Sequence, residues 1–446
     1  RSHTRTEEVN RGLTKEMAIK EAHRCLDCVK PSCIEGCPVN INIPSFIKNI
    51  ERGQFIAAAK VLKNTSSLPA VCGRVCPQEK QCESKCIHLK MGEPAVAIGY
   101  LERFAADFER ESGNIVIPEI GQSKGIKVAA VGSGPAGLSF AGEMAKKGYD
   151  VTVFEALHEI GGVLKYGIPE FRLPNKIVDV EIENLKKMGV KFITDCIIGK
   201  TISVEQLEDD GFKGIFIASG AGLPNFMGIP GENLINIMSS NEYLTRVNLM
   251  DAANPTTDTP INIGHNVIVV GGGNTAMDSC RTARRLGGNV TLVYRRSEKE
   301  MPARAEEVKH AKEEGINFLT LHNPLEYIAD ENGAVKQVRL QEMKLGEPDE
   351  SGRRRPEPIP GAIKTIDADQ VIVAVGVSPN PLVPKSVEGL TLGRKSTIVV
   401  NTEMQSSRPE IYAGGDIVRG GATVILAMGD GRRAAENMDK QLSGNK

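Results

Sequence analysis

Two glycine-rich turns, each set between an apolar segment and a helix-like segment, constrain this chain more than any other feature of its sequence. The first follows residues 128–131 and reads Gly132-Ser133-Gly134-Pro135-Ala136-Gly137. The second follows residues 267–270 and reads Gly271-Gly272-Gly273-Asn274-Thr275-Ala276. A strand, a tight glycine turn and a helix open a βαβ unit of the dinucleotide-binding type. The sequence therefore predicts two Rossmann-like domains in an α/β chain.

The first turn matches the full G-x-G-x-x-G pattern. Gly132 permits the tight turn, Gly134 lets the backbone approach a pyrophosphate, and Gly137 permits close packing of helix on strand. The next predicted strand, residues 151–154, ends in an acid that can accept hydrogen bonds from ribose hydroxyls. The candidate binding residues are Gly132, Gly134, Pro135, Ala136, Gly137 and Glu155.

The second turn has Ala276 in place of the third glycine, which still allows helix packing. The predicted strand 290–294 ends in Arg295-Arg296, where an acid would favour NAD. The two arginines favour a contact with a 2′-phosphate, although a solvated strand end or pairing with Glu298 or Glu300 would give the same pattern. An acid-ended and an arginine-ended site together predict FAD and NADP(H). The candidates here are Gly271, Gly273, Asn274, Thr275, Ala276, Arg295 and Arg296.

Eight of the ten cysteines fall between Cys25 and Cys86. Clustered thiols in a cytoplasmic enzyme are typical of metal or cluster ligands, and we expect this chain to be cytoplasmic. The spacing is C-x2-C-x4-C-x3-C-P and then C-x3-C-P-x4-C-x3-C. Structural zinc sites with four cysteines each remain an alternative to iron–sulfur clusters, in which a Cys before Pro can serve the second cluster.

The composition excludes several other classes. Acidic and basic residues number 56 and 55 among 446, so no basic excess points to nucleic acid. The apolar runs are too short to span a membrane. The start, Arg1-Ser2-His3-Thr4, lacks Met and an apolar signal region, so we expect a piece of a longer chain. Residues 346–360 are charged and proline-rich and predict a loop or hairpin.

The C-terminal part adds a third feature. A short apolar segment ends in Gly414-Gly415-Asp416, and small-residue turns end two other segments at 218–220 and 374–376. With the two glycine turns, residues 126–446 resemble the pyridine nucleotide–disulfide reductase superfamily. That resemblance implies a discontinuous FAD domain in which Gly415 and Asp416 contact the cofactor. Cys196 and Cys280 are isolated from each other, so we expect no disulfide reduction.

Nearly the whole chain is similar to the glutamate synthase small (β) subunit family, which includes the large subunit of NADH-dependent reduced ferredoxin:NADP oxidoreductase. The motifs that carry this resemblance are Arg24-Cys25-Leu26-Asp27-Cys28, Gly73-Arg74-Val75-Cys76-Pro77-Gln78, Tyr166-Gly167-Ile168-Pro169, Tyr294-Arg295-Arg296 and Glu300-Met301-Pro302. The family implies FAD, NADPH and two [4Fe–4S] clusters. It also implies a protein partner that accepts or donates electrons, either a glutamate synthase large subunit or a ferredoxin-linked flavoprotein subunit.

The resemblance also implies the cluster ligands. One cluster would be held by Cys25, Cys28, Cys33 and Cys86, and the other by Cys37, Cys76, Cys82 and Glu102. Cys72 stays outside this scheme, and an ordinary helix-surface salt bridge is the alternative role for Glu102. Gly162 joins the FAD set.

The expected architecture is a helical iron–sulfur domain at 1–120 and an FAD domain at 121–255 and 377–446, interrupted by an NADPH domain at 256–376. We expect hydride transfer between NADPH and FAD, then single-electron steps through the clusters, with no acid–base side chain. The alternatives are a ferredoxin:NADP oxidoreductase subunit, favoured by residues 40–44, 155–158 and 243–250, and a zinc-bearing module without enzyme activity.

Overall fold

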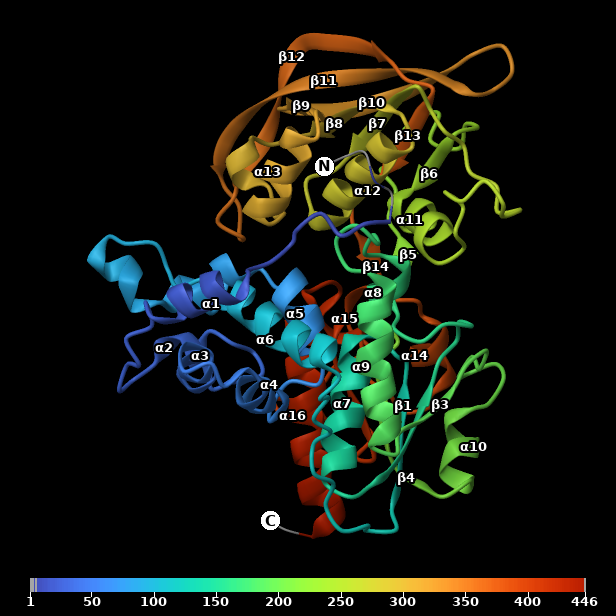
Figure 1. Ribbon diagram of the computed structural model, residues 1–446. Coiled ribbons are helices and arrows are strands. Elements are labelled where there is room, and N and C mark those ends of the chain that lie inside the picture. The colour runs from blue at the N-terminus through green and yellow to red at the C-terminus, as the bar shows by residue number, and fades with distance from the viewer. Residues whose placement is uncertain (1–3, 5, 445–446) are drawn as a thin grey trace. The chain divides into compact units, whose positions relative to one another are not determined.

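The computed structural model describes residues 4 and 6–444, which form two compact units (Figure 1). The larger unit comprises Asn10–Lys165, Arg172–Ala221 and Ser378–Lys446. The smaller unit comprises Arg1–Val9, Tyr166–Phe171 and Gly222–Val377. The smaller unit therefore includes residues 222–255, which lie before the predicted start of the NADPH domain at residue 256. Each unit is described by itself below.

The N-terminal part of the larger unit is helical. In α3, Asn42 caps the helix by accepting from Ser45 N, and Phe46, Ile47 and Ile50 form its buried face at helical spacing. Helices α5 and α6 approach closely because Gly73 lies against the backbone of Arg103. The helices of this part are α1 (Lys15–Ala22), α2 (Ser32–Glu35), α3 (Ile43–Glu51), α4 (Phe55–Lys63), α5 (Pro69–Val75), η1 (Gln78–Lys80), η2 (Glu83–Lys85), η3 (Ile87–Met91) and α6 (Ile98–Ser112).

A parallel five-stranded sheet forms the rest of the larger unit, in the order β15-β4-β1-β2-β3. Its strands are β1 (Lys127–Val131), β2 (Asp150–Phe154), β3 (Lys191–Ile193), β4 (Phe212–Ile217) and β15 (Ile411–Ala413). Because β15 comes from the C-terminal segment and pairs with β4, this domain is discontinuous in sequence, as predicted.

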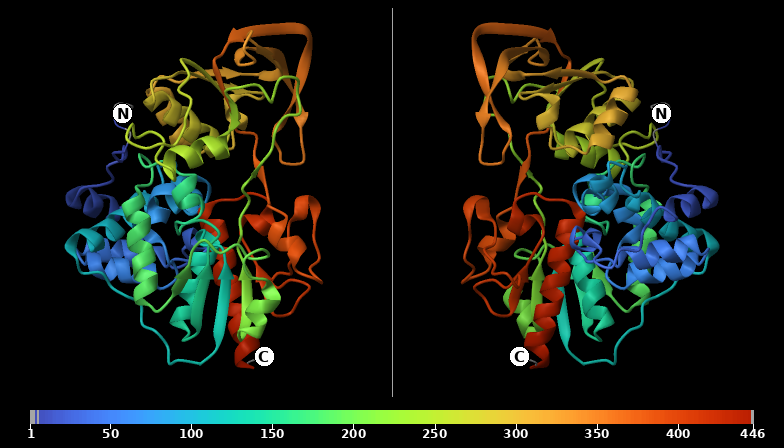
Figure 2. Two further views of the ribbon diagram at one scale, coloured as in Figure 1. Left: turned by 90° about the vertical axis from the view of Figure 1, so that its right-hand side faces the viewer. Right: turned by 90° about the vertical axis from the view of Figure 1, so that its left-hand side faces the viewer.

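Helices cover both faces of this sheet. Helix α7 (Pro135–Lys146) connects β1 to β2, and Phe140 on it stacks on Phe216 of β4 at 4.6 Å between ring centroids. Helix α16 (Val424–Ser443), the red helix that ends at the C-terminus in Figure 2, packs beside α7. The other helices of this unit are α8 (Val163–Tyr166), α9 (Asn175–Lys187), α10 (Val204–Asp209), α14 (Leu382–Ser386), η5 (Arg394–Ser396) and α15 (Asp416–Arg419).

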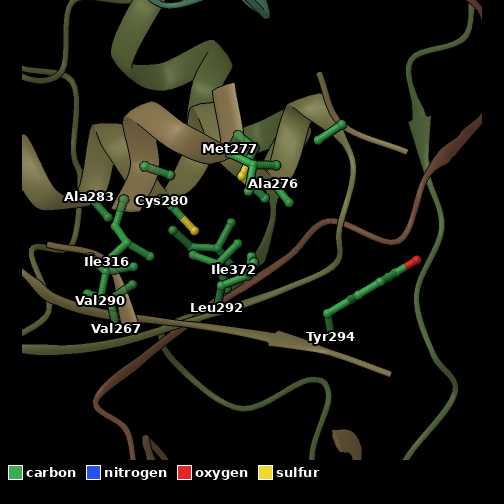
Figure 3. Packing of buried hydrophobic residues seen from close by; sticks show 14 of the residues in the cluster. Val267, Ala276, Met277, Cys280, Ala283, Val290, Leu292, Tyr294, Ile316 and Ile372 are labelled. Atoms are coloured by element: carbon green, nitrogen blue, oxygen red, sulfur yellow. The ribbon is translucent and has the colours of Figure 1, made fainter. Parts of the chain in front are cut away.

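The smaller unit has three layers. Its central parallel sheet has the order β6-β13-β7-β8-β9 and is formed by β6 (Ile237–Ser239), β7 (Asn266–Val270), β8 (Asn289–Tyr294), β9 (Asn317–Thr320) and β13 (Gln370–Val373). Figure 3 shows one face of this sheet, where Val267, Val290 and Leu292 pack against Cys280 and Met277 of a helix. The helices on this side are α11 (Ser240–Asn248), α12 (Asn274–Arg285), η4 (Glu298–Glu300) and α13 (Ala305–Glu313).

On the other face, Ile268, Val270 and Val293 pack against Val338 and Leu340 of an antiparallel sheet. This sheet consists of β10 (His322–Ala329), β11 (Val335–Pro348) and β12 (Arg354–Asp367). The last two strands form a long hairpin that contains the predicted excursion at 346–360. A short pair, β5 (Leu223–Pro224) with β14 (Val377–Ser378), completes the structure. Among the described residues, we find no helix long and apolar enough to cross a lipid bilayer.

Candidate functional site

The first glycine turn has one open position between two crowded ones. Gly132 has φ +104°, and a β-carbon there would collide with the carbonyl oxygen of Ala218. A β-carbon at Gly137 would collide with the carbonyl oxygen of Gly132. At Gly134 a β-carbon would meet nothing within 4 Å. Gly132 and Gly137 are therefore required by packing, whereas Gly134 keeps space clear at the N-terminus of α7, where backbone N–H groups can receive phosphate.

Glu155 and Gly162 lie at this same turn. The Glu155 carboxylate is buried, accepts from Ser133 N at 3.0 Å with one oxygen and from Leu157 N at 2.9 Å with the other. The first oxygen also accepts from the Ser133 hydroxyl, so it is the oxygen bonded to Leu157 N that keeps a lone pair for a further donor such as a ribose hydroxyl. A β-carbon at Gly162 would lie 2.9 Å from Gly134 Cα, so glycine is needed for the two loops to approach.

Gly415 and Asp416 reach the turn from the C-terminal segment. A β-carbon at Gly415 would lie 3.1 Å from Ala136 Cβ, next to Pro135 in the first turn of α7. Burial raises the pKa of Asp416 to about 6. Asp430 of α16 accepts from Gly415 N at 3.0 Å and forms a two-bond ion pair with Arg419. Sequence reasoning missed this supporting pair, for which the only signal is an acid between two glycines in a helix.

The second turn repeats this geometry in the smaller unit. Gly271 has φ +141°, and a β-carbon there would collide with the carbonyl oxygen of Ala374. A β-carbon at Gly273 would meet only Pro302 Cγ, at 4.0 Å. Ala276 is fully buried in the packing of α12 on the sheet, whereas Thr275 is exposed. Asn274 begins α12, and its side-chain oxygen accepts from Arg304 N at 2.9 Å.

The two arginines after β8 point to different surroundings. Arg295 is exposed. Arg296 is buried, and its guanidinium donates to Asp349 of the β11–β12 hairpin at 2.6 Å. Neither arginine pairs with Glu298 or Glu300 in the described part of the chain, where Glu298 bonds Lys312 and Glu300 accepts from Ser297. The structure therefore offers Arg295 to solvent and gives Arg296 an internal anion.

Four half-exposed cysteines form one group in the larger unit, which we call the outer group: Cys25, Cys28, Cys33 and Cys86. Burial, and then the charges of Cys25 and Cys86, raise the pKa of the Cys33 thiol to about 11. Burial raises the pKa of Cys25, and the charge of Cys28 acts in the same direction. These mutual effects indicate that the four thiols are neighbours, although Cys86 lies 53 positions after Cys33 in the sequence.

Four buried cysteines and one carboxylate form a second group, which we call the inner group: Cys37, Cys72, Cys76, Cys82 and Glu102. Burial, and then the charges of Glu102 and Cys72, raise the pKa of Cys37 to about 11. Burial and the charges of Glu83, Glu102 and Cys37 raise the pKa of Cys82. Among the described residues, no three ligand side chains converge on a single metal ion. The two groups are defined by these electrostatic effects between neighbours.

Glu102 is the member of the inner group with an unsatisfied atom. Its Oε1 is buried and receives no hydrogen bond from the part of the chain that the structure describes. Burial, with a smaller contribution from Glu181, raises its pKa to about 8. A buried carboxylate oxygen without a donor is costly unless a cation or ligand occupies its free side. The surroundings of Glu102 thus fit a cluster ligand better than a surface salt bridge.

The inner group adjoins the dinucleotide-type domain of its own unit. A β-carbon at Gly429 in α16 would lie 2.8 Å from the carbonyl oxygen of Pro38, which follows Cys37. The Cys72 thiol donates to Met428 Sδ at 3.5 Å. Helix α16 also contacts the first glycine turn, since Gly431 lies against the backbone of Ala136. One turn of α16 therefore touches both the inner group and the turn at Gly134.

Comparison with known proteins agrees with this arrangement. Residues 1–114 match the family described as dihydropyrimidine dehydrogenase domain II, 4Fe-4S cluster, and residues 126–431 match the pyridine nucleotide–disulphide oxidoreductase family. The solved structure of Mycobacterium tuberculosis FprA in complex with NADPH aligns with a TM-score of 0.61 at 19% identity, over 72% of this chain and 85% of that one. At this identity the likeness shows the fold alone.

Curated relatives are more similar. The glutamate synthase [NADPH] small chain of Halomonas elongata is 37% identical over 94% of this chain and 90% of its own length. That of Escherichia coli is 35% identical, over 97% and 93%. The NADPH-Fe(3+) oxidoreductase subunit beta of Geobacter sulfurreducens is 36% identical, but the match spans only 65% of its length.

The fold, the paired glycine turns and the cysteine groups define an oxidoreductase of the pyridine nucleotide–disulphide class with an N-terminal iron–sulfur domain. Within that class, the chain belongs to the glutamate synthase small-chain family.

Proposed function

We propose that this chain is an NADPH-dependent oxidoreductase subunit that binds FAD at the first glycine turn, NADPH at the second, and one [4Fe–4S] cluster at each cysteine group. The observation that carries this proposal is the pair of open positions, Gly134 and Gly273, at the starts of α7 and α12. Each lies beside glycines that the fold itself requires, yet packing does not require glycine at either one. The cleared space suits a pyrophosphate at a helix N-terminus.

In this scheme the side chains of this protein bind and orient the two dinucleotides. Glu155 would accept a hydrogen bond from the ribose of FAD, and Asp416 would contact the ribityl chain of FAD. Arg295 would meet the 2′-phosphate of NADPH, because it is exposed at the end of β8. When bound, FAD supplies two-electron exchange with nicotinamide and one-electron exchange with clusters. No side chain of this chain is assigned an acid–base role.

The two cysteine groups differ in burial, and this suggests their order. The inner group would hold the cluster nearer to FAD, because its residues touch the same turn of α16 as Ala136. The outer group is half-exposed, so its cluster would exchange electrons with another protein. Apolar side chains exposed beside this group support a docking role: Leu26 is 54% exposed, Val29 99% and Met91 55%.

The partner is a further subunit or domain that carries its own redox centre. Several relatives are named as small chains or beta subunits, which supports association of this chain with another subunit. We propose a glutamate synthase large subunit, with a ferredoxin-linked flavoprotein subunit as the alternative. We place the chain in the cytoplasm, where free thiols persist as cluster ligands.

Two alanine substitutions test the cofactor assignment. Gly134→Ala adds a methyl group to open space, so the apoprotein should fold while FAD content falls strongly. Gly273→Ala should keep FAD content and raise the KM for NADPH, so each variant is the control of the other. Gly137→Ala, by contrast, should destabilise the fold through the clash with Gly132. FAD absorbance, NADPH:dye activity and thermal unfolding are measured for each. Full FAD occupancy in Gly134→Ala, or an unchanged KM in Gly273→Ala, would refute the assignment.

A further inference from the structure

The end of β8, where we propose that the ribose of NADPH binds, already pairs with a carboxylate of the same unit. Arg296, two residues after the end of β8, donates through one terminal guanidinium nitrogen to Asp349 Oδ2 at 2.6 Å. The arginine side chain is only 7% exposed and the aspartate 22%. The Nε of Arg296 is buried and has no hydrogen-bond partner among the described residues. Of the acids in the described part of the chain, Asp349 is the only one that pairs with Arg296.

The partner lies at the tip of the long hairpin. Asp349 follows the last residue of β11, and its backbone closes the turn by accepting from Gly352 N and donating to Arg353 O, both at 2.8 Å. Its other carboxylate oxygen accepts from Ser351 N at 2.9 Å and from the Ser351 hydroxyl. These hydrogen bonds hold the pKa of Asp349 below its usual range, so the carboxylate is charged at neutral pH. The tip therefore carries a fixed negative charge against Arg296.

This arrangement matters because Arg295 and Arg296 are adjacent at the site proposed for the 2′-phosphate. Two free arginines would present two positive charges, whereas the structure compensates one of them. A 2′-phosphate carries more charge than a carboxylate and offers three acceptor oxygens. The 2′-phosphate can therefore compete with Asp349 for the guanidinium of Arg296, whose Nε has no hydrogen-bond partner among the described residues.

We propose that Asp349 limits the preference for NADPH: it is an internal counter-ion of Arg296 that the 2′-phosphate replaces when the cofactor binds. The exchange releases the hairpin tip from the end of β8. Asp349 weakens NADPH binding by the free energy that is needed to break its ion pair with Arg296. The affinity for NADH is unaffected, because NADH has no 2′-phosphate. The inference rests on the proposed NADPH site at the second glycine turn.

The experiment uses the holoprotein and two probes, adenosine 2′,5′-bisphosphate and 5′-AMP, with Asp349→Asn as the variant. We expect the Kd of the bisphosphate to fall about threefold to tenfold, since the competing ion pair is removed, and the Kd of 5′-AMP to stay unchanged. The KM for NADPH should fall with kcat unchanged. Asp330→Asn is the matched control, because Asp330 accepts from Asn332 N and Ala334 N in the β10–β11 turn and pairs with no arginine among the described residues.

A second measurement does not depend on the variant folding. In the parent protein, adenosine 2′,5′-bisphosphate should speed tryptic cleavage at Arg353 and Arg354 of the tip, whereas 5′-AMP should not. The inference would be overturned if Asp349→Asn bound the bisphosphate equally well or more weakly than the parent. It would also be overturned if the rate of tryptic cleavage at the tip did not change with the bisphosphate. If Arg295→Ala still abolishes the NADPH preference in that case, the proposed function stands and only the counter-ion role of Asp349 fails.

Discussion

At the residue scale, the glycine turns show what a sequence pattern specifies. The G-x-G spacing named Gly134 and Gly273 as the positions that a pyrophosphate approaches, and both leave open space in the structure. The pattern could not show that Arg295 and Arg296 face different surroundings. The difference depends on Asp349, which lies more than fifty residues away and meets Arg296 only because the hairpin folds back. Local spacing thus predicts backbone roles better than it predicts the partners of long side chains.

The first prediction at this scale concerns Arg295. Arg295→Ala should lower kcat/KM for NADPH about tenfold to a hundredfold, mainly through KM, because one charge-assisted contact to phosphate is worth on the order of 1.5–3 kcal/mol. The value for NADH should stay within about twofold. Steady-state kinetics with both cofactors measures this. Equal loss with NADH, or a parent enzyme that uses the two cofactors equally, would contradict the role.

The second concerns Glu102. Its buried Oε1 lacks a donor among the described residues, which an iron ligand would explain. Glu102→Ala should alter the EPR signal of one reduced cluster and leave the other signal intact. A fall in iron of up to about half is expected if that cluster becomes labile. Glu111→Ala, on the same helix α6 but with a side chain 70% exposed, is the control. Two unchanged signals would make Glu102 an ordinary buried acid.

At the scale of elements, the sequence predicted the strands and helices of both βαβ openings because apolar periodicity and glycine turns are local signals. The charged stretch 346–360 is confirmed as a hairpin region, but the 14-residue lengths of β11 and β12 could not be read from it. Their exposed, mixed composition lacks the alternation that marks a half-buried strand. The buried ion network between α12 and the end of α13 was also not predicted, since its charged residues cannot be told apart in the sequence from those of a solvent-exposed helix face.

That network gives the third prediction. Arg281 and Arg285 of α12 bond the fully buried carboxylate of Glu314. Both guanidinium groups also lie over the Phe171 ring, at 4.8 and 3.7 Å from its centroid. Glu314→Gln should destabilise the smaller unit by about 3 kcal/mol at pH 7, because two buried cations each lose a charged partner, although Arg281 keeps its ion pair with Glu307. Urea unfolding followed by circular dichroism measures the loss. The control, Glu298→Gln, removes a half-exposed pair with Lys312 and should cost less than about 1 kcal/mol.

The pH dependence of this network has a definite sign. Burial raises the pKa of Glu314, but hydrogen bonds from Arg285 and Arg281 outweigh it, so the pKa lies below its usual value. A depressed folded-state pKa adds stability above the unfolded value of about 4.3, and this stability is lost as pH falls toward the folded value. Between about pH 5 and pH 3 the parent should therefore lose more stability than Glu314→Gln. Parallel losses would mean that Glu314 does not titrate in this range.

At the scale of the whole molecule, the fold class and the family were predictable, because the chain matches its relatives over nearly its full length. The division of the chain into two units was less predictable from the sequence. The smaller unit takes in residues 222–255 and the short segment Tyr166–Phe171. Such boundaries depend on which side chains pack together, for example Phe171 against Arg285, and no local composition marks them. The assignment of cofactors to domain ranges therefore stays a prediction.

The fourth prediction is the iron content. Outer and inner groups each supply enough ligands for one cubane, so anaerobically reconstituted protein should hold about eight iron and eight sulfide per chain. Cys28→Ala and Cys82→Ala, one from each group, should each remove about half of the iron. Iron analysis of the parent at about four per chain, or loss of all iron from either variant, would contradict two independent sites.

The burial of the inner group has a consequence for how the protein is made. Cys37, Cys72, Cys76 and Cys82 are each at most 9% exposed, and α5, α6 and α16 surround them. A maturation factor that hands over a preassembled cluster must bring its own thiolates within bonding distance of the receiving sulfurs. It can do so at the outer group in the finished fold, but not at the inner one. If the inner group holds a cluster, as proposed, that cluster would have to be delivered while the N-terminal helices are still open, and cofactor insertion would be coupled to the last step of folding of the larger unit.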